Sequence, residues 1–332
     1  MKKKILITGG AGFIGSHLVQ FFTKKYKDYL IVNIDSLTYA SNYKFIKDLE
    51  KYENYCFFKL DINDKDSLKE LFLKYKFDTI IHLAAESHVD NSIENPQIFA
   101  KTNILGTLNL LDNVRNSWTN KSNKLFYHIS TDEVYGSLSN DGFFNEESKY
   151  DPRSPYSASK AASDHFVRAY YHTYNIPVII SNCSNNFGPN QNKEKLIPVV
   201  INSVINKSKI PVYGDGKNIR DWLYVEDHIY AIDKILHQGK IGETYLIGGD
   251  CELSNIQLIN MIIKITDNLL KRDKGFSNNL IKFVEDRKGH DFRYAIDFTK
   301  LMNQTLWKPS KDFEKNLHKT IDWYINKSQL QN

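Results

Sequence analysis

The sequence of 332 residues contains little cysteine, methionine or proline, with 3, 3 and 8 residues respectively. The cysteines, Cys56, Cys183 and Cys251, are too few and too far apart for a disulfide framework or a C-x-x-C metal site. No apolar run approaches the roughly 18 residues needed to span a bilayer. The first residues are basic but precede only a short apolar stretch, unlike a signal peptide. We therefore expect a protein of the reducing cytoplasm that holds no metal.

The chain also has little net charge. The chain has 44 Lys and Arg against 39 Asp and Glu, a net charge of +5. So small a surplus argues against nucleic acid or a membrane as a partner. With 41% hydrophobic residues, the chain has enough apolar material for a sizeable core, and its length suggests about two domains.

Short β-type runs alternate with helical patterns through the first half of the chain. We expect strands at 4–8, 29–34, 57–60, 78–83, 124–130 and 177–181, and helices at 14–25, 65–75, 103–117 and 156–174. Such alternation requires right-handed crossovers and predicts an α/β fold with a doubly wound parallel Rossmann sheet. Beyond about residue 185 the alternation stops and loops rich in Gly, Asn and Pro appear. We expect a dinucleotide-binding domain at 1–184 and a smaller mixed α/β substrate domain at 185–332, interleaved in the C-terminal half.

A glycine turn lies between the first expected strand and the first helix. Gly9, Gly12 and Gly15 are spaced three apart. In this position the first allows a tight turn, the second lets the backbone approach a pyrophosphate and the third permits close packing of helix on strand. Ordinary turns also use glycine, but this placement favours a dinucleotide cofactor.

The ends of the next strands refine the choice of cofactor. Asp35 follows Gly15 by twenty residues, where an acid accepts hydrogen bonds from a ribose diol and repels a 2′-phosphate. This favours NAD over NADP, although a surface Asp in a turn is the simpler alternative. Asp61 and Ile62 end the third strand and can border an adenine. Ala84 and Ala85 end the fourth, where small side chains let the backbone approach the cofactor.

Tyr156 and Lys160 begin the long helix and lie on one of its faces. An ammonium group near a phenol favours the phenolate, so Tyr156 can remove a hydroxyl proton during hydride transfer. The pair Y-x-x-x-K occurs by chance in many helices. Together with the glycine turn and with Ser130 or Thr131 at the end of the fifth strand, it indicates an active site.

Two neighbouring acids, Asp132 and Glu133, follow the fifth strand. Adjacent carboxylates in a turn are usually solvated, but these lie at the edge of the sheet where the cofactor pocket is expected. Two acids in unequal environments can act as one acid and one base. Hydride transfer alone needs neither, so the pair indicates a second reaction, the removal of a proton and the loss of water.

The sequence resembles the extended short-chain dehydrogenase/reductase family and, within it, the dTDP-glucose 4,6-dehydratase family. The resemblance covers essentially the whole chain. Its markers are the turn at 9–15 and the segments 84–90 (AAESHVD), 131–136 (TDEVYG), 156–160 (YSASK), 182–189 (NCSNNFGP), 194–198, 211–222 and 286–291. The TDEVYG segment is the discriminating one. The family usually has Pro where Lys288 stands and a different sequence at 190–193.

The resemblance implies an internal redox dehydration of dTDP-glucose to dTDP-4-keto-6-deoxyglucose, a step of rhamnose-type deoxysugar biosynthesis. Tyr156 takes the proton of the sugar C4 hydroxyl while the C4 hydride passes to NAD, and the hydride later returns to C6. Glu133 removes the C5 proton and Asp132 protonates the leaving C6 hydroxyl. Thr131 hydrogen-bonds the C4 oxygen. Lys160 lowers the pKa of Tyr156 and binds the nicotinamide ribose.

The resemblance also implies contact residues. Expected cofactor contacts are Gly9, Gly12, Phe13, Ile14, Gly15, Asp35, Leu37, Thr38, Asp61, Ile62, Leu83, Ala84, Ala85, Ser87, Asn103, Tyr156, Lys160 and Asn186. Expected substrate contacts are Ser87, Thr131, Asn185, Lys195, Leu196, Pro211, Val212, Tyr213, Arg220, Asn255, Arg287, His290 and Tyr294. Among them, Arg220 and Arg287 suit a diphosphate, and residues 211–213 can flank the thymine ring.

Simpler interpretations of some of these residues stay open. Arg220 can be a structural partner of Asp221 or Asp227, and His290 a plain surface histidine. His88 and Asp90 can be loop scaffolding.

Two other functions stay open at this stage. A nucleotide-sugar 4-epimerase needs the same cofactor and Tyr156 with Lys160, but has no use for the acid pair. An NAD-sensing protein without turnover would typically lose the Tyr or the Lys. The resemblance further implies a homodimer with helices 103–117 and 156–174 at a four-helix interface, although packing within one chain would explain their apolar character equally well.

Overall fold

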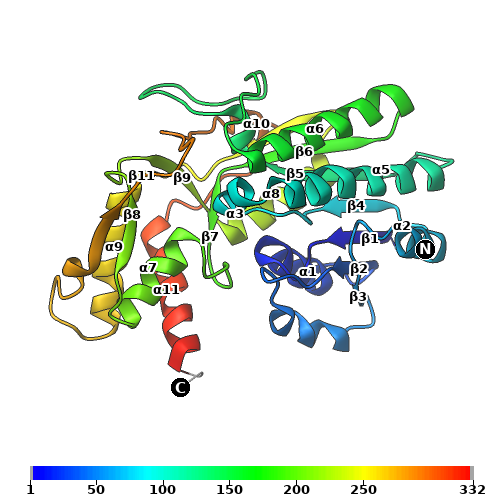
Figure 1. Cartoon of the computed structure of the whole chain (residues 1–332). Coiled ribbons are helices and arrows are strands. Elements are labelled where there is room, and N and C mark those ends of the chain that lie inside the picture. The colour runs from blue at the N-terminus through cyan, green and yellow to red at the C-terminus, as the bar shows by residue number, and fades with distance from the viewer. Residues whose placement is uncertain (1–2, 330–332) are drawn as a thin grey trace.

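Seven parallel strands form the central sheet of the computed structural model, which describes residues 3–329. They are β1 (Lys3–Thr8), β2 (Tyr29–Asp35), β3 (Tyr55–Lys59), β4 (Thr79–His82), β5 (Leu125–Thr131), β6 (Val178–Cys183) and β10 (Thr244–Ile247). Their order is β10-β6-β5-β4-β1-β2-β3, and every neighbouring pair is parallel. The predicted doubly wound sheet is confirmed (Figure 1).

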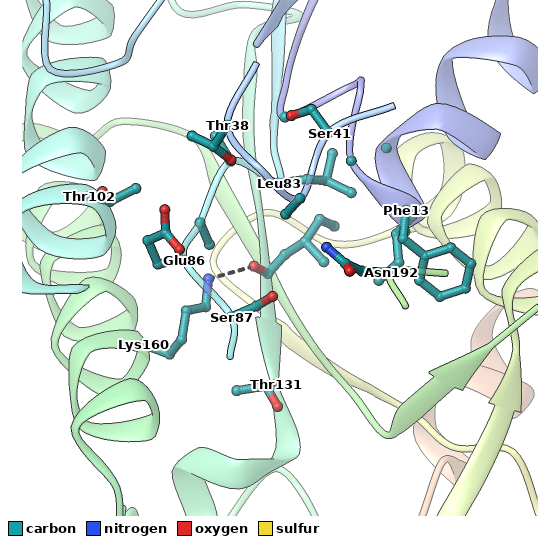
Figure 2. Close-up of a pocket in the computed structure, with 18 of the residues that line it drawn as sticks. Phe13, Thr38, Ser41, Leu83, Glu86, Ser87, Thr102, Thr131, Lys160 and Asn192 are labelled. Carbon is teal, nitrogen blue, oxygen red and sulfur yellow. Dashed lines mark hydrogen bonds between the residues drawn. The ribbon is translucent and has the colours of Figure 1, made fainter. Parts of the chain in front are cut away.

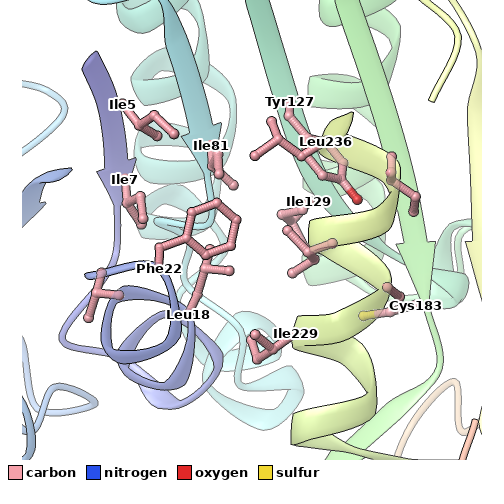
Figure 3. Close-up of a cluster of buried hydrophobic side chains, with 14 of the residues drawn as sticks. Ile5, Ile7, Leu18, Phe22, Ile81, Tyr127, Ile129, Cys183, Ile229 and Leu236 are labelled. Carbon is pink, nitrogen blue, oxygen red and sulfur yellow. The ribbon is translucent and has the colours of Figure 1, made fainter. Parts of the chain in front are cut away.

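Helices cover both faces of this sheet. On one face lie α1 (Phe13–Lys25), α8 (Val225–Gln238) and α10 (Thr299–Thr305), and on the other α2 (Lys65–Tyr75), α5 (Gly106–Ser117) and α6 (Pro155–Tyr174). Side chains alternate along each strand, so Ile5 and Ile7 pack on the α1 side while Leu6 packs on the other. Figure 3 shows Phe22 of α1 and Leu236 of α8 in the hydrophobic cluster on the α1 side of the sheet, together with Ile5 and Ile7. Burial on both faces explains why the strands are apolar runs rather than alternating ones.

The helix expected at 103–117 begins later than predicted. Three short pieces precede α5: α3 (Val89–Glu94), α4 (Pro96–Phe99) and a π-helical segment, η3 (Ala100–Leu105). The other predicted helices and all six predicted strands lie within about three residues of their expected bounds. The seventh strand, β10, was not predicted, because it comes after the regular alternation has stopped.

Most of the second half of the chain, apart from β10, α8 and α10, forms a smaller unit beside the sheet (Figure 1). Its strands are β7 (Asn185–Phe187), β9 (Ile219–Tyr224) and β11 (Glu252–Ser254) in one sheet and β8 (Ile210–Tyr213) with β12 (Ile281–Val284) in another. Its helices are α7 (Leu196–Ile205), α9 (Asn255–Leu269) and α11 (Phe313–Gln329), which enclose a core of their own. Within residues 3–329 there are also four short 3-10 turns: η1 (Tyr43–Phe45), η2 (Lys47–Lys51), η4 (Asp132–Tyr135) and η5 (Asn278–Leu280).

Because β7 follows β6 directly, this smaller unit adjoins the carboxyl ends of the strands, the edge at which open α/β sheets bind ligands. Among residues 3–329, no helix is long and apolar enough to cross a membrane.

Candidate active site

The glycine turn has the geometry of a dinucleotide site. Gly9 has a φ of +73°, and a Cβ there would lie 2.7 Å from the backbone of Ala84. A Cβ on Gly15 would lie 2.1 Å from the Gly9 carbonyl oxygen, so helix and strand approach closely only because both are glycine. Gly12 is the N-cap residue of α1 and faces the cavity described below. The free N–H groups of a 13-residue helix therefore point at the place where a pyrophosphate fits.

Asp35 closes the turn from the end of β2. Its Oδ2 accepts a hydrogen bond from Ala11 N at 2.9 Å, and its Oδ1 accepts from Leu37 N at 2.8 Å and from Ser41 Oγ at 2.7 Å. These bonds fix the carboxylate at the cavity wall, where its remaining lone pairs can accept from a ribose diol.

A cavity of about 510 Å³ runs along the carboxyl edge of the sheet. Of the expected cofactor contacts, sixteen line it: Gly9, Gly12, Phe13, Ile14, Gly15, Asp35, Thr38, Asp61, Ile62, Leu83, Ala84, Ala85, Ser87, Tyr156, Lys160 and Asn186. Figure 2 shows Thr38, Leu83, Ser87 and Lys160 around the hollow. These features fit NAD. The glycine turn has no room for a Cβ, Asp35 lies at the ribose position, and the cavity runs along the edge of the sheet.

Two expected cofactor contacts lie elsewhere. Leu37, which has a φ of +57°, packs its side chain against the α1-side core. Asn103 is buried in η3, where its Oδ1 accepts from Glu86 N and its Nδ2 donates to Glu86 O and Ser159 Oγ. It holds the cavity wall instead of lining it.

Several lining residues were not predicted. Glu86 directly follows the Ala84-Ala85 strand end and could have been found from that position. Lys101 and Thr102 come from η3 and Asn192 from the loop after β7, where no sequence signal indicates a role. Glu194 lies in the same loop and begins the family segment 194–198, so that segment could have indicated it.

A second cavity, of about 240 Å³, lies between the sheet and the smaller unit. All the expected substrate contacts except Thr131 line it: Ser87, Asn185, Lys195, Leu196, Pro211, Val212, Tyr213, Arg220, Asn255, Arg287, His290 and Tyr294. Thr131 lines the first cavity. Glu133, Ser87 and Lys195 line both, so the two cavities adjoin at the end of β5.

Cations concentrate in this second cavity. Arg220 is buried and donates to the carbonyl oxygens of Ile219 and Asp291 at 2.7 and 2.9 Å, with its guanidinium over the Tyr294 ring. It forms no ion pair with Asp221 or Asp227, whose carboxylates accept backbone N–H groups. The scaffold interpretation of Arg220 as their ion-pair partner is therefore wrong.

Two further polar side chains, Lys195 and His290, border the second cavity. Lys195 Nζ donates to Ser87 O at 2.8 Å, and His290 Nδ1 lies 2.7 Å from Asp286 Oδ1. With two guanidinium groups nearby, this part of the cavity suits an anionic ligand such as a diphosphate.

The acid pair stands where the cavities meet. Thr131 ends β5, caps η4 and accepts from Glu133 N, which places Asp132 and Glu133 in one tight turn. Burial and the nearby Glu133 raise the pKa of Asp132 well above its usual value. Burial also raises the pKa of Glu133, but the charges of Lys195 and Arg220 oppose that rise. Asp132 is thus the better proton donor of the two and Glu133 the better acceptor.

Tyr156 and Lys160 face the pair from α6, whose start is fixed by a capping box at Ser154 and by Pro155 in the first turn. Lys160 Nζ donates to Ile129 O at 2.8 Å, the bond drawn in Figure 2. Burial and Glu133 raise the pKa of Tyr156 well above 10. That Lys160 lowers the pKa of Tyr156 stays a prediction.

Comparisons with known proteins agree with this geometry. The family model described as GDP-mannose 4,6 dehydratase matches residues 6–320. A probable dTDP-glucose 4,6-dehydratase of Sinorhizobium fredii is 49% identical over 97% of this chain and 93% of its own. The crystal structure of dTDP-glucose 4,6-dehydratase from Bacillus anthracis in complex with NAD is 41% identical, with a TM-score of 0.87 and 98% of each chain covered. The dTDP-glucose 4,6-dehydratase DesIV from Streptomyces venezuelae, with NAD and TYD bound, is 38% identical, with a TM-score of 0.90 and the same coverage.

Proposed function

The chain belongs to the GDP-mannose 4,6 dehydratase family, and from this premise we propose that it is a dTDP-glucose 4,6-dehydratase. It is an NAD-dependent hydro-lyase that converts dTDP-glucose into dTDP-4-keto-6-deoxyglucose in deoxysugar biosynthesis. When bound, NAD supplies the acceptor and donor for the hydride that moves from C4 to C6. The observation that carries this assignment is the acid pair at the junction of the two cavities, buried Asp132 and partly buried Glu133, each with a raised pKa.

Each side chain has a distinct part in the proposed chemistry. Tyr156 takes the proton of the C4 hydroxyl, and Thr131 hydrogen-bonds the same oxygen. Once C4 is a ketone, the C5 hydrogen is acidic and Glu133 removes it. Asp132 donates its proton to the departing C6 hydroxyl, which leaves as water. Lys160, which lines the same cavity, lowers the pKa of Tyr156 and would bind the nicotinamide ribose.

The second cavity supports the proposal that a nucleoside diphosphate binds there. Arg220, Arg287 and Lys195 offer positive charge and N–H donors to the diphosphate. Tyr213 and Pro211 of β8 are partly exposed at the same cavity and can flank the thymine ring. We propose that residues 1–184 bind the cofactor and 185–332 the nucleotide, with α8 and β10 returning to the sheet.

The acid pair also separates this function from 4-epimerisation, which needs Tyr156 and Lys160 alone. Product analysis with dTDP-, UDP- and GDP-glucose side by side tests the proposal. We expect the 4-keto product, seen by its absorbance in alkali, from dTDP-glucose. Substrate deuterated at C4 should deliver its label to the new C6 methyl group. A product that keeps its C6 hydroxyl would contradict the assignment.

We propose further that the chain forms a homodimer through α5 and α6. Three apolar side chains support this because they stand exposed on α6 and on the segment before α5: Ile98, Leu105 and Phe166, at 46%, 53% and 38%. Light scattering should give twice the chain mass, and Leu105→Asp with Phe166→Asp should give the monomer. A wild-type monomer would refute the interface.

The free thiols of Cys56, Cys183 and Cys251 support a reducing, cytoplasmic location.

A further inference from the structure

A row of charged and phenolic side chains continues along α6 beyond the two residues already given roles. Tyr156, Lys160, Asp164 and Arg168 are spaced four apart and therefore share one face of the helix. The side chain of Asp164 has no exposed surface. A carboxylate this deeply buried is costly unless it is paired and hydrogen-bonded, so its partners indicate what it does.

Three hydrogen bonds reach one oxygen of Asp164 from three different segments. Its Oδ2 accepts from Ser130 Oγ at 2.9 Å, from Asn182 Nδ2 at 3.2 Å and from Tyr150 OH at 2.8 Å. These partners come from β5, β6 and the segment that leads into α6. One carboxylate thus joins the ends of both strands to the helix that carries Tyr156.

The link extends to Thr131. Asn182 Nδ2, besides contacting Asp164, donates to the Thr131 carbonyl oxygen at 3.0 Å. Ser130 directly precedes Thr131, and Ile129 before it accepts the Lys160 ammonium at 2.8 Å. Lys160 therefore holds Ile129, Asp164 holds Ser130, and Asn182, itself bonded to Asp164, holds Thr131, the last residue of β5 before the acid pair.

The negative charge of Asp164 also interacts with the positive charge of Lys160. Burial lowers the pKa of Lys160, and the negative charge of Asp164 opposes that lowering. Burial raises the pKa of Asp164, but His128 and the charges of Lys160 and Arg168 outweigh it and bring this pKa below its usual value. His128 Nε2 lies 3.1 Å from Asp164 Oδ1. The titratable groups that face this pair are His128 on β5, Cys183 on β6, Tyr135 on η4, Arg168 on α6, Tyr150 before α6 and, toward Lys160, His82 on β4.

We propose that Asp164 is a positioning residue for the dehydration: its carboxylate fixes the end of β5 that presents Thr131 and the acid pair, and it supplies the countercharge for the buried ammonium of Lys160. The inference rests on the proposed function, which uses Thr131, Tyr156 and Lys160. It adds a residue that touches neither cavity and acts through Ser130, Asn182 and Lys160.

The test compares Asp164→Asn with the wild type in steady-state turnover of dTDP-glucose between pH 6 and 10. The amide keeps the shape but loses the charge. We expect kcat to fall at least tenfold with KM changed less than twofold, because the residue contacts no substrate. We also expect the alkaline limb of the kcat profile to move to lower pH by half a unit or more, since Lys160 then loses its proton more readily.

Asp233→Asn is the matched control. Asp233 also accepts from a lysine and a tyrosine, Lys25 and Tyr26, at 2.6 and 2.5 Å, with His237 Nδ1 3.3 Å away, but it lies outside both cavities. This variant should keep the wild-type kcat and pH profile even if it unfolds at a lower temperature. Equal losses of kcat in both variants, or an unchanged profile in Asp164→Asn, would overturn the proposal.

Ser130→Ala covers the case in which Asp164→Asn does not fold. It removes one tether and keeps the charge, so kcat should fall about threefold or more while the alkaline limb stays in place. A Ser130→Ala enzyme with wild-type kcat would refute the positioning role. Wild-type turnover in the same assay tests the proposed function itself, whereas only the ratio of variant to wild type tests Asp164.

Discussion

Arg287 and Asp90, which are 197 residues apart in the sequence, form a bidentate ion pair at the second cavity. Arg287 Nε lies 2.5 Å from Asp90 Oδ1, and its second terminal nitrogen lies 2.8 Å from Oδ2. The guanidinium also lies over the Tyr213 ring, 5.2 Å from its centre. Both side chains are partly exposed, so the pair adds little to stability. The pair holds the Arg287 guanidinium at the wall of the second cavity, which both residues line.

Replacing Arg287 by Lys should weaken substrate binding. Lysine lacks the planar guanidinium group with which Arg287 can bind a carboxylate and a diphosphate at the same time. We therefore expect KM for dTDP-glucose to rise about tenfold while kcat changes less than about twofold. Initial rates over a range of substrate concentrations measure both. Arg293→Lys is the control, because Arg293 makes a similar pair with Glu252 outside both cavities. The same rise in both variants would argue against a diphosphate contact.

Replacing Glu133 by Gln should stop proton removal from C5. The amide cannot act as a base, so turnover should fall by roughly 10² to 10⁴. In deuterated water, mass spectrometry of the hexose should find no label at C5. Glu146→Gln, which alters another carboxylate of raised pKa away from the cavities, should keep the label. If Glu133→Gln exchanges C5 at the wild-type rate, another group is the base.

Replacing Asp132 by Asn should lower activity and raise stability together. Its Oδ2 has no hydrogen-bond partner among residues 3–329, and burial raises its pKa well above the unfolded value of about 4. The wild type therefore loses stability as the pH rises from about 4 through the folded pKa, a loss that the uncharged amide avoids. At pH 8 we expect Tm to rise by about 2 °C, which corresponds to about 1 kcal/mol.

Thermal unfolding between pH 4.5 and 8 measures this effect. The difference in Tm between Asp132→Asn and the wild type should grow with pH, while kcat of the variant is at least a hundredfold lower. A constant difference across this range would mean that Asp132 is ionised throughout and cannot be the proton donor.

Replacing Asp35 by Asn should reduce the preference for NAD over NADP. The amide no longer repels a 2′-phosphate and is a weaker acceptor for the ribose diol, so NAD should bind at least tenfold more weakly while NADP binds no worse. Titration of cofactor-free protein with each dinucleotide, followed by fluorescence, gives both affinities. An equal loss for both would show that Asp35 matters only through its bonds to Ala11, Leu37 and Ser41.

Much of the fold followed from local patterns. Gly9 and Gly15 are required where backbone approaches backbone, and apolar runs such as 4–8 and 124–130 marked strands that are buried on both faces. The missed strand, β10, has four apolar or β-branched residues like the others. Only its pairing with β6 across some sixty residues identifies it as part of the same sheet.

The sequence alone determined which chemical groups the protein has and the order in which they occur: the glycine turn, the acid pair and the tyrosine and lysine one helical turn apart. Those features depend on neighbours along the chain. The tertiary structure decided which charges meet, since Asp90 with Arg287 and Asp164 with Ser130 and Asn182 come from distant segments. It also decided the protonation of Asp132 and Tyr156, because burial sets the cost of a charge and only the packed fold creates burial.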